Sequence, residues 1–174
     1  MKQLPKFPDK YWLKFSDDPV KIIPFNTNSK KIARKYIEQL KKLTSSLSIS
    51  AIYHRGSTAL GISGKGDIEI GLIPKKNCWF ETIILLTNHY KGIGNLDNDY
   101  CRFNDIFDGF DIEIILMRGY SAFLDKKIIK YLLANPELLK EYESVKKKYS
   151  FSKKEYNRHK DKFFRKVTKI IPEE

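Results

Sequence analysis

Residues 48–73, SISAIYHRGSTALGISGKGDIEIGLI, contain two strand-like runs joined by a glycine-rich segment. Ser48 to His54 is an apolar, β-branched run that ends at Arg55-Gly56-Ser57. The next residues carry glycines at positions 56, 61, 64 and 66, which are typical of a loop. From Asp67 to Ile70 acidic and aliphatic residues alternate, which is the period of a strand with two chemically different faces. The stretch therefore predicts a strand, a loop and a second strand with acids on one face.

The acidic pattern occurs a second time further along the chain. Alternation places Asp67 and Glu69 on one face of the first strand, where they can share a hard cation. Asp111 and Glu113 repeat the Asp-Ile-Glu-Ile pattern, so a neighbouring strand could add a third and a fourth carboxylate. Carboxylates that converge in this way hold the paired magnesium ions of phosphoryl-transfer enzymes. We expect all four acids to be catalytic, with Asp67, Glu69 and Asp111 binding Mg²⁺ or Mn²⁺. Glu113 is the alternative third ligand, and a solvent-exposed acidic face is the alternative for the whole pattern.

The turn before the acids has the features of a phosphate-binding site. Gly56 lets the backbone approach a phosphate, Ser57 adds a hydroxyl donor, and Arg55 lies beside them. Thr58 has two interpretations, as a phosphate ligand or as the N-cap of a helix that starts in the loop. Lys65 is either a phosphate ligand or a solvated loop lysine.

The remaining pattern predicts an α+β or mixed α/β fold, with a mixed sheet flanked by helices and a C-terminal helical extension. Asp108-Gly109 separates two β-rich segments and favours a hairpin turn between them. We expect one structural domain in three parts: an irregular lead-in at 1–19, a core at 20–118, and helices at 119–174 that pack on the core. The expected strands are 20–25, 48–54, 67–73, 100–107 and 110–117, and the expected helices are 29–43, 79–90, 123–133, 138–149 and 153–170.

The composition favours polyanionic partners and a reducing compartment. Lys and Arg number 33 against 21 Asp and Glu, a formal net charge of +12 that favours nucleotides, RNA or anionic surfaces. Solvated helix faces are the alternative, because much of the excess stands in runs such as 146–148. Cys78 and Cys101 form neither a disulfide framework nor a zinc motif, and neither a signal peptide nor a membrane span is visible. We therefore expect a cytoplasmic protein without a membrane partner.

The motif from His54 to Gly61, followed by Lys65 and the acids of 67–70, resembles that of the polymerase-beta-like nucleotidyltransferase superfamily. The GrpB family is the most similar, since its members carry Gly-Ser-Thr-Ala in the turn and a lysine before the acidic strand. The resemblance covers about residues 20–170, because it includes Ile23-Pro24-Phe25, YLLANPEL at 131–138, Tyr142, Lys146, Tyr156, Lys160 and Phe163. This chain departs from the family in its full acidic set and in a shorter loop after Ser57.

The resemblance implies a metal-dependent nucleotidyltransferase that moves a nucleoside monophosphate from an NTP, with ATP as the expected donor, to a hydroxyl or phosphate of an acceptor. The expected nucleotide-binding residues are Arg55, Gly56, Ser57, Thr58, Lys65 and Lys160, of which Lys160 is otherwise a helix-surface lysine. The acceptor is left open, with RNA or tRNA suggested by the charge. Two alternatives stay open: a non-catalytic nucleotide- or RNA-binding module, and a toxin–antitoxin-type enzyme that modifies a tRNA or a protein.

Overall fold

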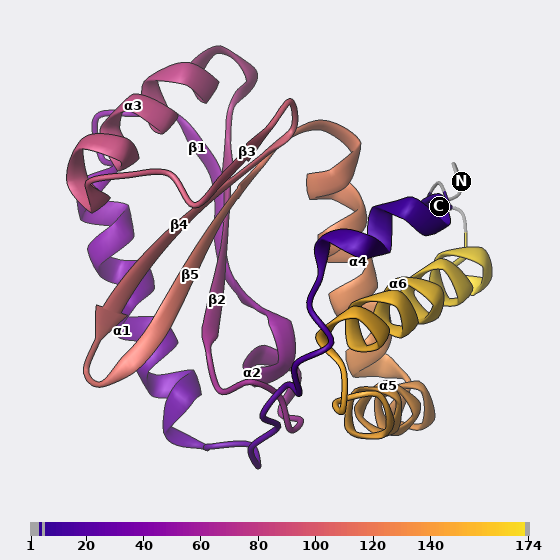
Figure 1. The fold of residues 1–174 in the computed structure, drawn as a ribbon. Coiled ribbons are helices and arrows are strands. Elements are labelled where there is room, and N and C mark those ends of the chain that lie inside the picture. The colour runs from indigo at the N-terminus through magenta and orange to yellow at the C-terminus, as the bar shows by residue number, and fades with distance from the viewer. Residues whose placement is uncertain (1–3, 5, 173–174) are drawn as a thin grey trace.

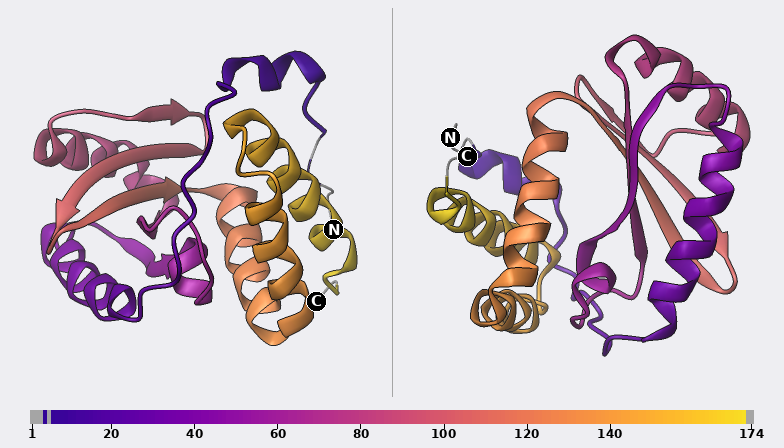
Figure 2. Two further views of the ribbon diagram at one scale, coloured as in Figure 1. Left: turned by 60° about the horizontal axis from the view of Figure 1, so that its bottom comes forward. Right: turned by 180° about the vertical axis from the view of Figure 1, so that it is seen from behind.

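The computed structural model describes residue 4 and residues 6–172. Its five-stranded mixed sheet consists of β1 (Ile49–Arg55), β2 (Ile68–Pro74), β3 (Asn95–Asp97), β4 (Tyr100–Phe107) and β5 (Phe110–Met117). The helices are α1 (Asn28–Leu43), α2 (Gly56–Leu60), α3 (Trp79–Tyr90), α4 (Gly119–Ala134), α5 (Pro136–Lys148) and α6 (Lys153–Ile170), with short 3-10 helices η1 (Asp9–Lys14) and η2 (Lys76–Cys78). Helices α1 and α3 cover one face of the sheet, and α4, α5 and α6 lie on its other side (Figure 1, Figure 2).

The two acidic strands are direct neighbours in the sheet. The strand order is β1-β2-β5-β4-β3, with β2 and β5 parallel and every other pair antiparallel. β4 and β5 form the expected hairpin, in which Asp108 and Gly109 both take positive φ, 49° and 79°. Glu69 stands opposite Glu113 in the parallel register of β2 and β5. The acids of both strands therefore share one face.

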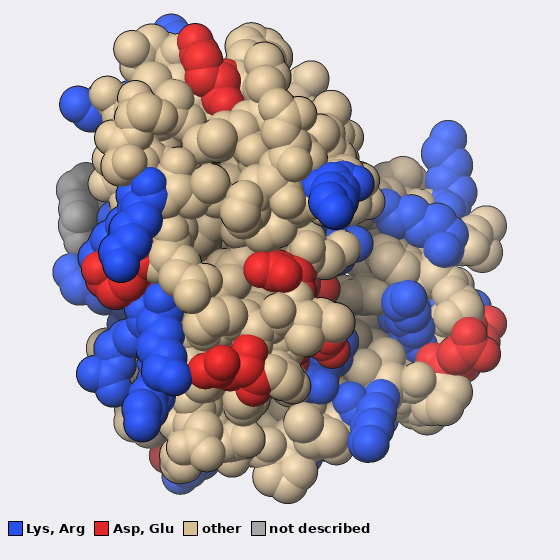
Figure 3. All heavy atoms as spheres, turned by 90° about the vertical axis from the view of Figure 1, so that its left-hand side faces the viewer, with Lys and Arg blue, Asp and Glu red and all other residues tan. Residues whose placement is uncertain are grey.

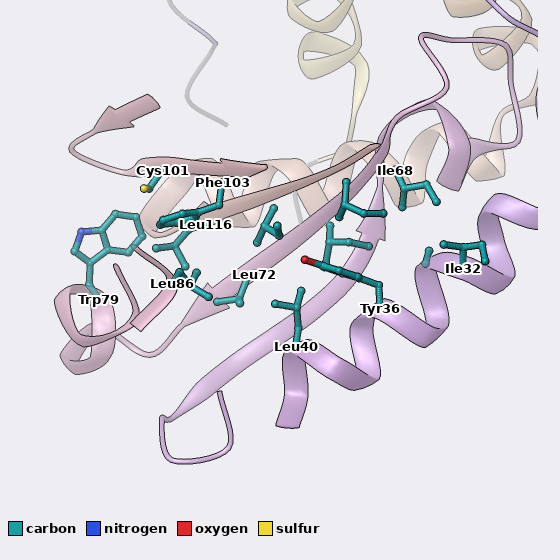
Figure 4. Close-up of a cluster of buried hydrophobic side chains, with 14 residues drawn as sticks. Ile32, Tyr36, Leu40, Ile68, Leu72, Trp79, Leu86, Cys101, Phe103 and Leu116 are labelled. Atoms are coloured by element: carbon teal, nitrogen blue, oxygen red, sulfur yellow. The ribbon is translucent and has the colours of Figure 1, made fainter. Parts of the chain in front are cut away.

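The aliphatic residues of the acidic strands build the core on the face that α1 and α3 cover (Figure 4). Ile68 and Ile70 are 0% exposed, and α1 places Tyr36 and Leu40 against this face. The apolar residues of α1 recur at three- and four-residue spacing, so its lysines face away from the sheet. Because the acids alternate with the core residues, they point to the side of α4, α5 and α6.

Segment 20–25 does not form the expected strand, so this prediction is wrong. Only Ile23 pairs, through two backbone hydrogen bonds with Gly64 of 2.8 and 3.1 Å. Pro24 has no N–H group to donate, which ends the ladder after one bridge. The lead-in also differs from an irregular segment, since residues 9–14 form η1. The edge strand β3 was not expected, because its three exposed residues lack an apolar alternation.

The lysine excess does not form one continuous strip on the side of α1 and α3. Figure 3 shows this side with Lys and Arg in separate groups at the left and right of the view, and with acidic side chains and broad uncharged areas between them. This side therefore offers no continuous basic groove of the kind that tracks a nucleic-acid backbone. In the part of the chain that the structure describes, no helix has both the length and the apolar character needed to cross a membrane.

Candidate functional site

Glu69 of β2 and Asp111 and Glu113 of β5 lie on the sheet face that turns away from α1 and α3, and Asp67 directly precedes β2 on the same side. Asp67, Asp111 and Glu113 line one surface hollow of about 710 Å³, together with Lys65. Glu69 lines a second cavity, of about 580 Å³, which lies between the sheet, α4, α6 and the N-terminal segment. The structure thus brings three of the acids to one hollow and places Glu69 at the neighbouring cavity.

Lys65 neutralises the acids of the first hollow. Its Nζ lies 2.6 Å from Asp67 Oδ2 and 3.7 Å from Glu113 Oε1. Burial alone would lower the pKa of Lys65, but Asp67 and Glu113 raise it well above its usual value. Arg102 Nη1 lies 3.6 Å from the same oxygen of Glu113. The like charges of Asp67 and Glu113 are therefore compensated by bases of the chain itself.

Replacing Lys65 by Met is expected to lower the Tm without divalent ions by about 2–4 °C, equivalent to about 1 kcal/mol in a chain of this size. The same change should increase the rise in Tm that MgCl2 produces, because the ion then has no ammonium to compete with for Asp67 and Glu113. Scanning fluorimetry with and without MgCl2 measures both effects, with Lys76→Met as the control because Lys76 is exposed on η2. If MgCl2 raises the Tm of Lys65→Met no more than that of the wild type, the ion does not bind beside Lys65.

Arg55, at the end of β1, links Glu69 to α4. Its Nη1 donates a hydrogen bond to Glu69 Oε2 at 2.6 Å, and its Nη2 donates to Asp125 Oδ1 at 2.7 Å. Tyr53 OH donates to Asp125 Oδ2 at 2.7 Å. Burial alone would raise the pKa of Glu69, but Arg55 and then Lys160 lower it below its usual value. Arg55 was expected to bind a nucleotide, and the structure shows its guanidinium hydrogen-bonded to two carboxylates.

The Gly-Ser turn begins α2 and fits tightly between Glu69 and α5. Gly56 has a φ of +73°, and a Cβ at this position would lie 2.4 Å from Glu69 Oε1, so a larger residue would be strained and would displace Glu69. Ser57 Oγ accepts a hydrogen bond from Lys146 Nζ at 2.6 Å. The turn therefore joins the acidic face on one side to α5 on the other.

Lys146 of α5 lies at the candidate site, but the sequence analysis did not select it as a site residue. Its side chain is 0% exposed, and its Nζ also donates to the carbonyl oxygen of Ser63. Burial and then the charge of Lys160 lower the pKa of Lys146 to about 7, although the nearby acids oppose this shift. The interpretation of run 146–148 as a solvated face is thus wrong for Lys146. The available signal was its four-residue spacing from Tyr142, which is also buried.

Thr58 is not the N-cap of α2, and its hydroxyl is committed inside the fold. The helix begins at Gly56 with Arg55 as its N-cap, so Thr58 lies within the first turn. Its Oγ1 lies 2.9 Å from His54 Nε2 and donates to the carbonyl oxygen of Asp67 at 3.3 Å. Burial lowers the pKa of His54 to about 4, so this ring is neutral near pH 7. Thr58 therefore ties α2 to β1 and to the start of β2.

Lys160 of α6 lines the second cavity, with its Nζ 4.9 Å from the centroid of the Tyr156 ring. Within the described ranges, neither Lys160 nor Lys146 forms an ion pair with a carboxylate. The two ammonium groups are close enough for Lys160 to depress the pKa of Lys146. Two amino groups without an ion pair thus lie beside Ser57 and Glu69, an arrangement that suits an anionic ligand.

The carboxylates fit Mg²⁺ or Mn²⁺ in the type of their donors. These ions prefer oxygen ligands, and Asp67 Oδ2 is a buried oxygen for which the described residues supply no hydrogen-bond donor. Its 2.6 Å contact with Lys65 is an ion pair without hydrogen-bond geometry. No three Asp, Glu, His or Cys side chains in residues 4 and 6–172 are grouped closely enough to hold an ion as they stand. Asp67 with Glu113 or Asp111 would hold the ion on the side where Lys65 now lies.

A mixed sheet with two neighbouring acidic strands, a Gly-Ser turn before the first of them and helices over the acids is a nucleotidyltransferase-like α+β fold. The chain is similar in structure to the conserved protein GrpB from Enterococcus faecalis, with a TM-score of 0.66 and 16% identity over 86% of this chain and 98% of that chain. A second similar structure is the STING-associated CdnE c-di-GMP synthase from Capnocytophaga granulosa, with a TM-score of 0.42 and 16% identity over 87% of this chain and 56% of the other. No protein-family model matches the sequence, and no curated protein matches it. The similarity to GrpB confirms the fold class expected from the sequence.

Proposed function

We propose that the chain is a metal-dependent nucleotidyltransferase whose donor is an NTP, with ATP as the expected one. The observation that carries this proposal is the buried ammonium of Lys146, which meets Ser57 of the Gly-Ser turn. A buried ammonium without an ion pair is costly, and the phosphates of a nucleotide would supply negative charge in direct contact with it. Glu69 and Asp67 are close enough to act on the charge of Lys146, and transfer to an acceptor would occur on this acidic side.

The reaction balances as a displacement at phosphorus. An acceptor oxygen forms a bond to the α-phosphorus while the bond from that phosphorus to the bridging oxygen breaks, and the electron pair leaves with pyrophosphate. Bound Mg²⁺ or Mn²⁺ would neutralise phosphate charge and make an acceptor hydroxyl more acidic. Ser57 and Lys146 would hold the triphosphate. Glu69, oriented by Arg55, would take the proton of a hydroxyl acceptor.

A non-catalytic nucleotide- or RNA-binding module is the second candidate function. One observation favours it: Asp67, Glu69 and Glu113 are each ion-paired with a base of the chain. A toxin–antitoxin-type enzyme would share the chemistry of the first proposal and differ in its acceptor, a tRNA or a protein. Incubation with α-labelled NTPs, MgCl2 and a cell extract separates these functions. Label in RNA, protein or small molecules identifies the acceptor class, whereas ATP binding without any labelling favours the non-catalytic module.

Binding of ATP near pH 8 is expected to take up close to one proton. Lys146 is then mostly neutral, because its pKa is about 7, and an adjacent triphosphate favours the ammonium form and raises that pKa. Calorimetric titrations in buffers of different ionisation enthalpy measure the uptake. It should fall as the pH is lowered from 8 to 6, where Lys146 is already protonated. ATP binding with the same enthalpy in every buffer would remove Lys146 from the phosphate site.

The same pKa predicts how Lys146 affects stability. The pKa of Lys146 is lower in the folded protein than in the unfolded chain, so between about pH 7 and its usual pKa the unfolded chain binds more protons. The unfolding free energy therefore rises with pH across this window. Replacing Lys146 by Met, which is similar in length, removes this contribution. The difference in unfolding free energy between the variant and the wild type should therefore favour the variant most near pH 7 and shrink toward pH 10. Urea unfolding at several pH values measures this difference, and a pH-independent difference would contradict the prediction.

A further inference from the structure

The cavity of about 580 Å³ has a mostly apolar interior that the reaction described above does not use. Its volume is typical of a site for a small molecule. Aromatic side chains of the N-terminal segment form one wall, and aliphatic side chains of α4 form another: Phe7, Tyr11, Trp12, Phe15, Leu124 and Ile128. At one end the cavity reaches Gly56 and Glu69, beside the Gly-Ser turn. A molecule inside it would thus lie next to the proposed site of transfer.

The N-terminal wall is fixed to α6 by specific contacts. Asp17 accepts a hydrogen bond from Ser152 Oγ at 2.9 Å and forms an ion pair with Lys154. The backbone N–H of Lys153 donates to the carbonyl oxygen of Asp18 at 2.8 Å. These bonds hold the segment where its aromatic residues close the cavity, as Figure 2 shows for its course alongside α6. The segment is therefore part of the site and not an appendage of the fold.

The guanidinium and carboxylate groups that line the cavity are already paired within the protein, so they offer little for the recognition of a nucleobase. Arg55, Glu69 and Asp125 are bonded to one another, and Asp161 is ion-paired with Arg165 at 2.8 Å. Donors and acceptors of a nucleobase that faced the aliphatic wall of α4 would have no partners there, which is unfavourable for each of them. An aliphatic or aromatic body has no such groups and suits the walls.

We infer that this cavity binds the acceptor, an amphipathic molecule whose apolar body lies between the N-terminal segment and α4 and whose phosphate head lies beside Lys160. The inference rests on the proposed function and names the acceptor class for it. Lys160 is a cavity-lining cation without an ion-pair partner in the described residues, so it complements an anionic head. In the transfer, an oxygen of that head forms the bond to the α-phosphorus as pyrophosphate leaves, and no oxidant or reductant is needed.

Calorimetry with three probes tests the inference: dodecyl phosphate below its micellar concentration, 2-naphthyl phosphate and inorganic phosphate. At least one of the two apolar probes should bind about 100-fold more tightly than inorganic phosphate, and their comparison distinguishes an aliphatic from an aromatic body. Trp12 reports on the cavity directly, because it lines this space while Trp79 packs in the core on the other face of the sheet. Tryptophan emission should change with the bound probe, and Trp12→Phe should remove that change.

Ser121→Phe provides the matched variant, because Ser121 is exposed on α4 and lines the cavity, so the added ring occupies its space. It should weaken binding of the apolar probe at least about tenfold and leave ATP binding unchanged, whereas Lys130→Phe, exposed elsewhere on α4, should change neither. An unchanged Tm establishes that Ser121→Phe folds. If this variant does not fold, the change in Trp12 emission of the wild type on addition of the apolar probe tests the inference instead. Failure of both apolar probes, equal binding to Ser121→Phe, or loss of ATP binding in that variant would overturn the inference. If ATP itself does not bind the wild type, the proposed function fails independently.

Discussion

Asp67→Asn is expected to reduce NTP-dependent labelling on the order of 100-fold or more while the protein stays folded, since it deletes charge where the transition state needs it. Asn keeps the size of Asp67 but cannot neutralise a cation or pair with Lys65, whose Nζ lies 2.6 Å from its Oδ2. Lys65 already relieves the repulsion between Asp67 and Glu113, so the change brings no gain in stability. Loss of this partly exposed pair costs less than about 1 kcal/mol. Labelling assays and urea unfolding on the same preparation measure both quantities.

The matched control for this variant is Asp97→Asn, an exposed acid on the edge strand β3. It removes the same charge from the chain and should leave labelling unchanged. If Asp67→Asn retains full labelling, the acids of β2 are structural and the proposal of a transfer site at this face is wrong. If Asp67→Asn unfolds the protein, Asp67 belongs to the packing of the fold and not to its chemistry.

Ile68→Asn is expected to unfold the protein, in contrast to Asp67→Asn, which should lose activity and stay folded. Ile68 is 0% exposed between the sheet and α1, so the change loses buried aliphatic packing and leaves an amide without partners. Together these effects amount to about 4 kcal/mol or more, a large part of the stability of a natural domain. Urea unfolding measures the loss, and Ile68→Val should cost only about 1 kcal/mol. A stable Ile68→Asn protein would mean that the two faces of β2 are assigned the wrong way round.

Local sequence patterns predicted the central elements well. The alternation at 67–70, the turn signal at Asp108-Gly109 and the spacing of apolar residues in α1 each depend on neighbours a few positions away. The expected hairpin is confirmed, and α5 begins at Pro136, as its restricted φ favours. The other expected helices are present too, but α4 begins at Gly119, four residues earlier than expected, and the predicted loop contains the short helix α2. The prediction of a strand at 20–25 was wrong because a strand needs one partner strand along its length, whereas Ile23 pairs with Gly64 and Val20 donates to Ser150 in another segment.

Local sequence patterns could not predict the hydrogen-bond partners of the site residues. Arg55 was expected beside a nucleotide because it adjoins the Gly-Ser turn. In the structure its guanidinium donates a hydrogen bond to Asp125, which lies 70 positions later. Asp125 itself stands in a helical segment that shows no signal of function in the sequence. Lys146 stands in the lysine run 146–148, and runs of like charge usually lie on a solvated surface, so the sequence predicted that Lys146 is exposed. Such pairings depend on contacts between segments that are distant in the chain.

The alternation of acid and aliphatic residues establishes, without any structure, that Asp67 and Glu69 share a face and that Ile68 and Ile70 share the other, because successive side chains of a strand point to opposite sides. Whether that acidic face meets a second one depends on strand order, which is a property of the assembled sheet and brings β5 next to β2. The burial of Lys146 against Ser57 and the closure of the cavity by the N-terminal segment likewise require the packed helices α5 and α6. Periodicity along the chain encodes which side of an element is apolar, whereas the identity of the partner on that side follows from the packing of all elements together.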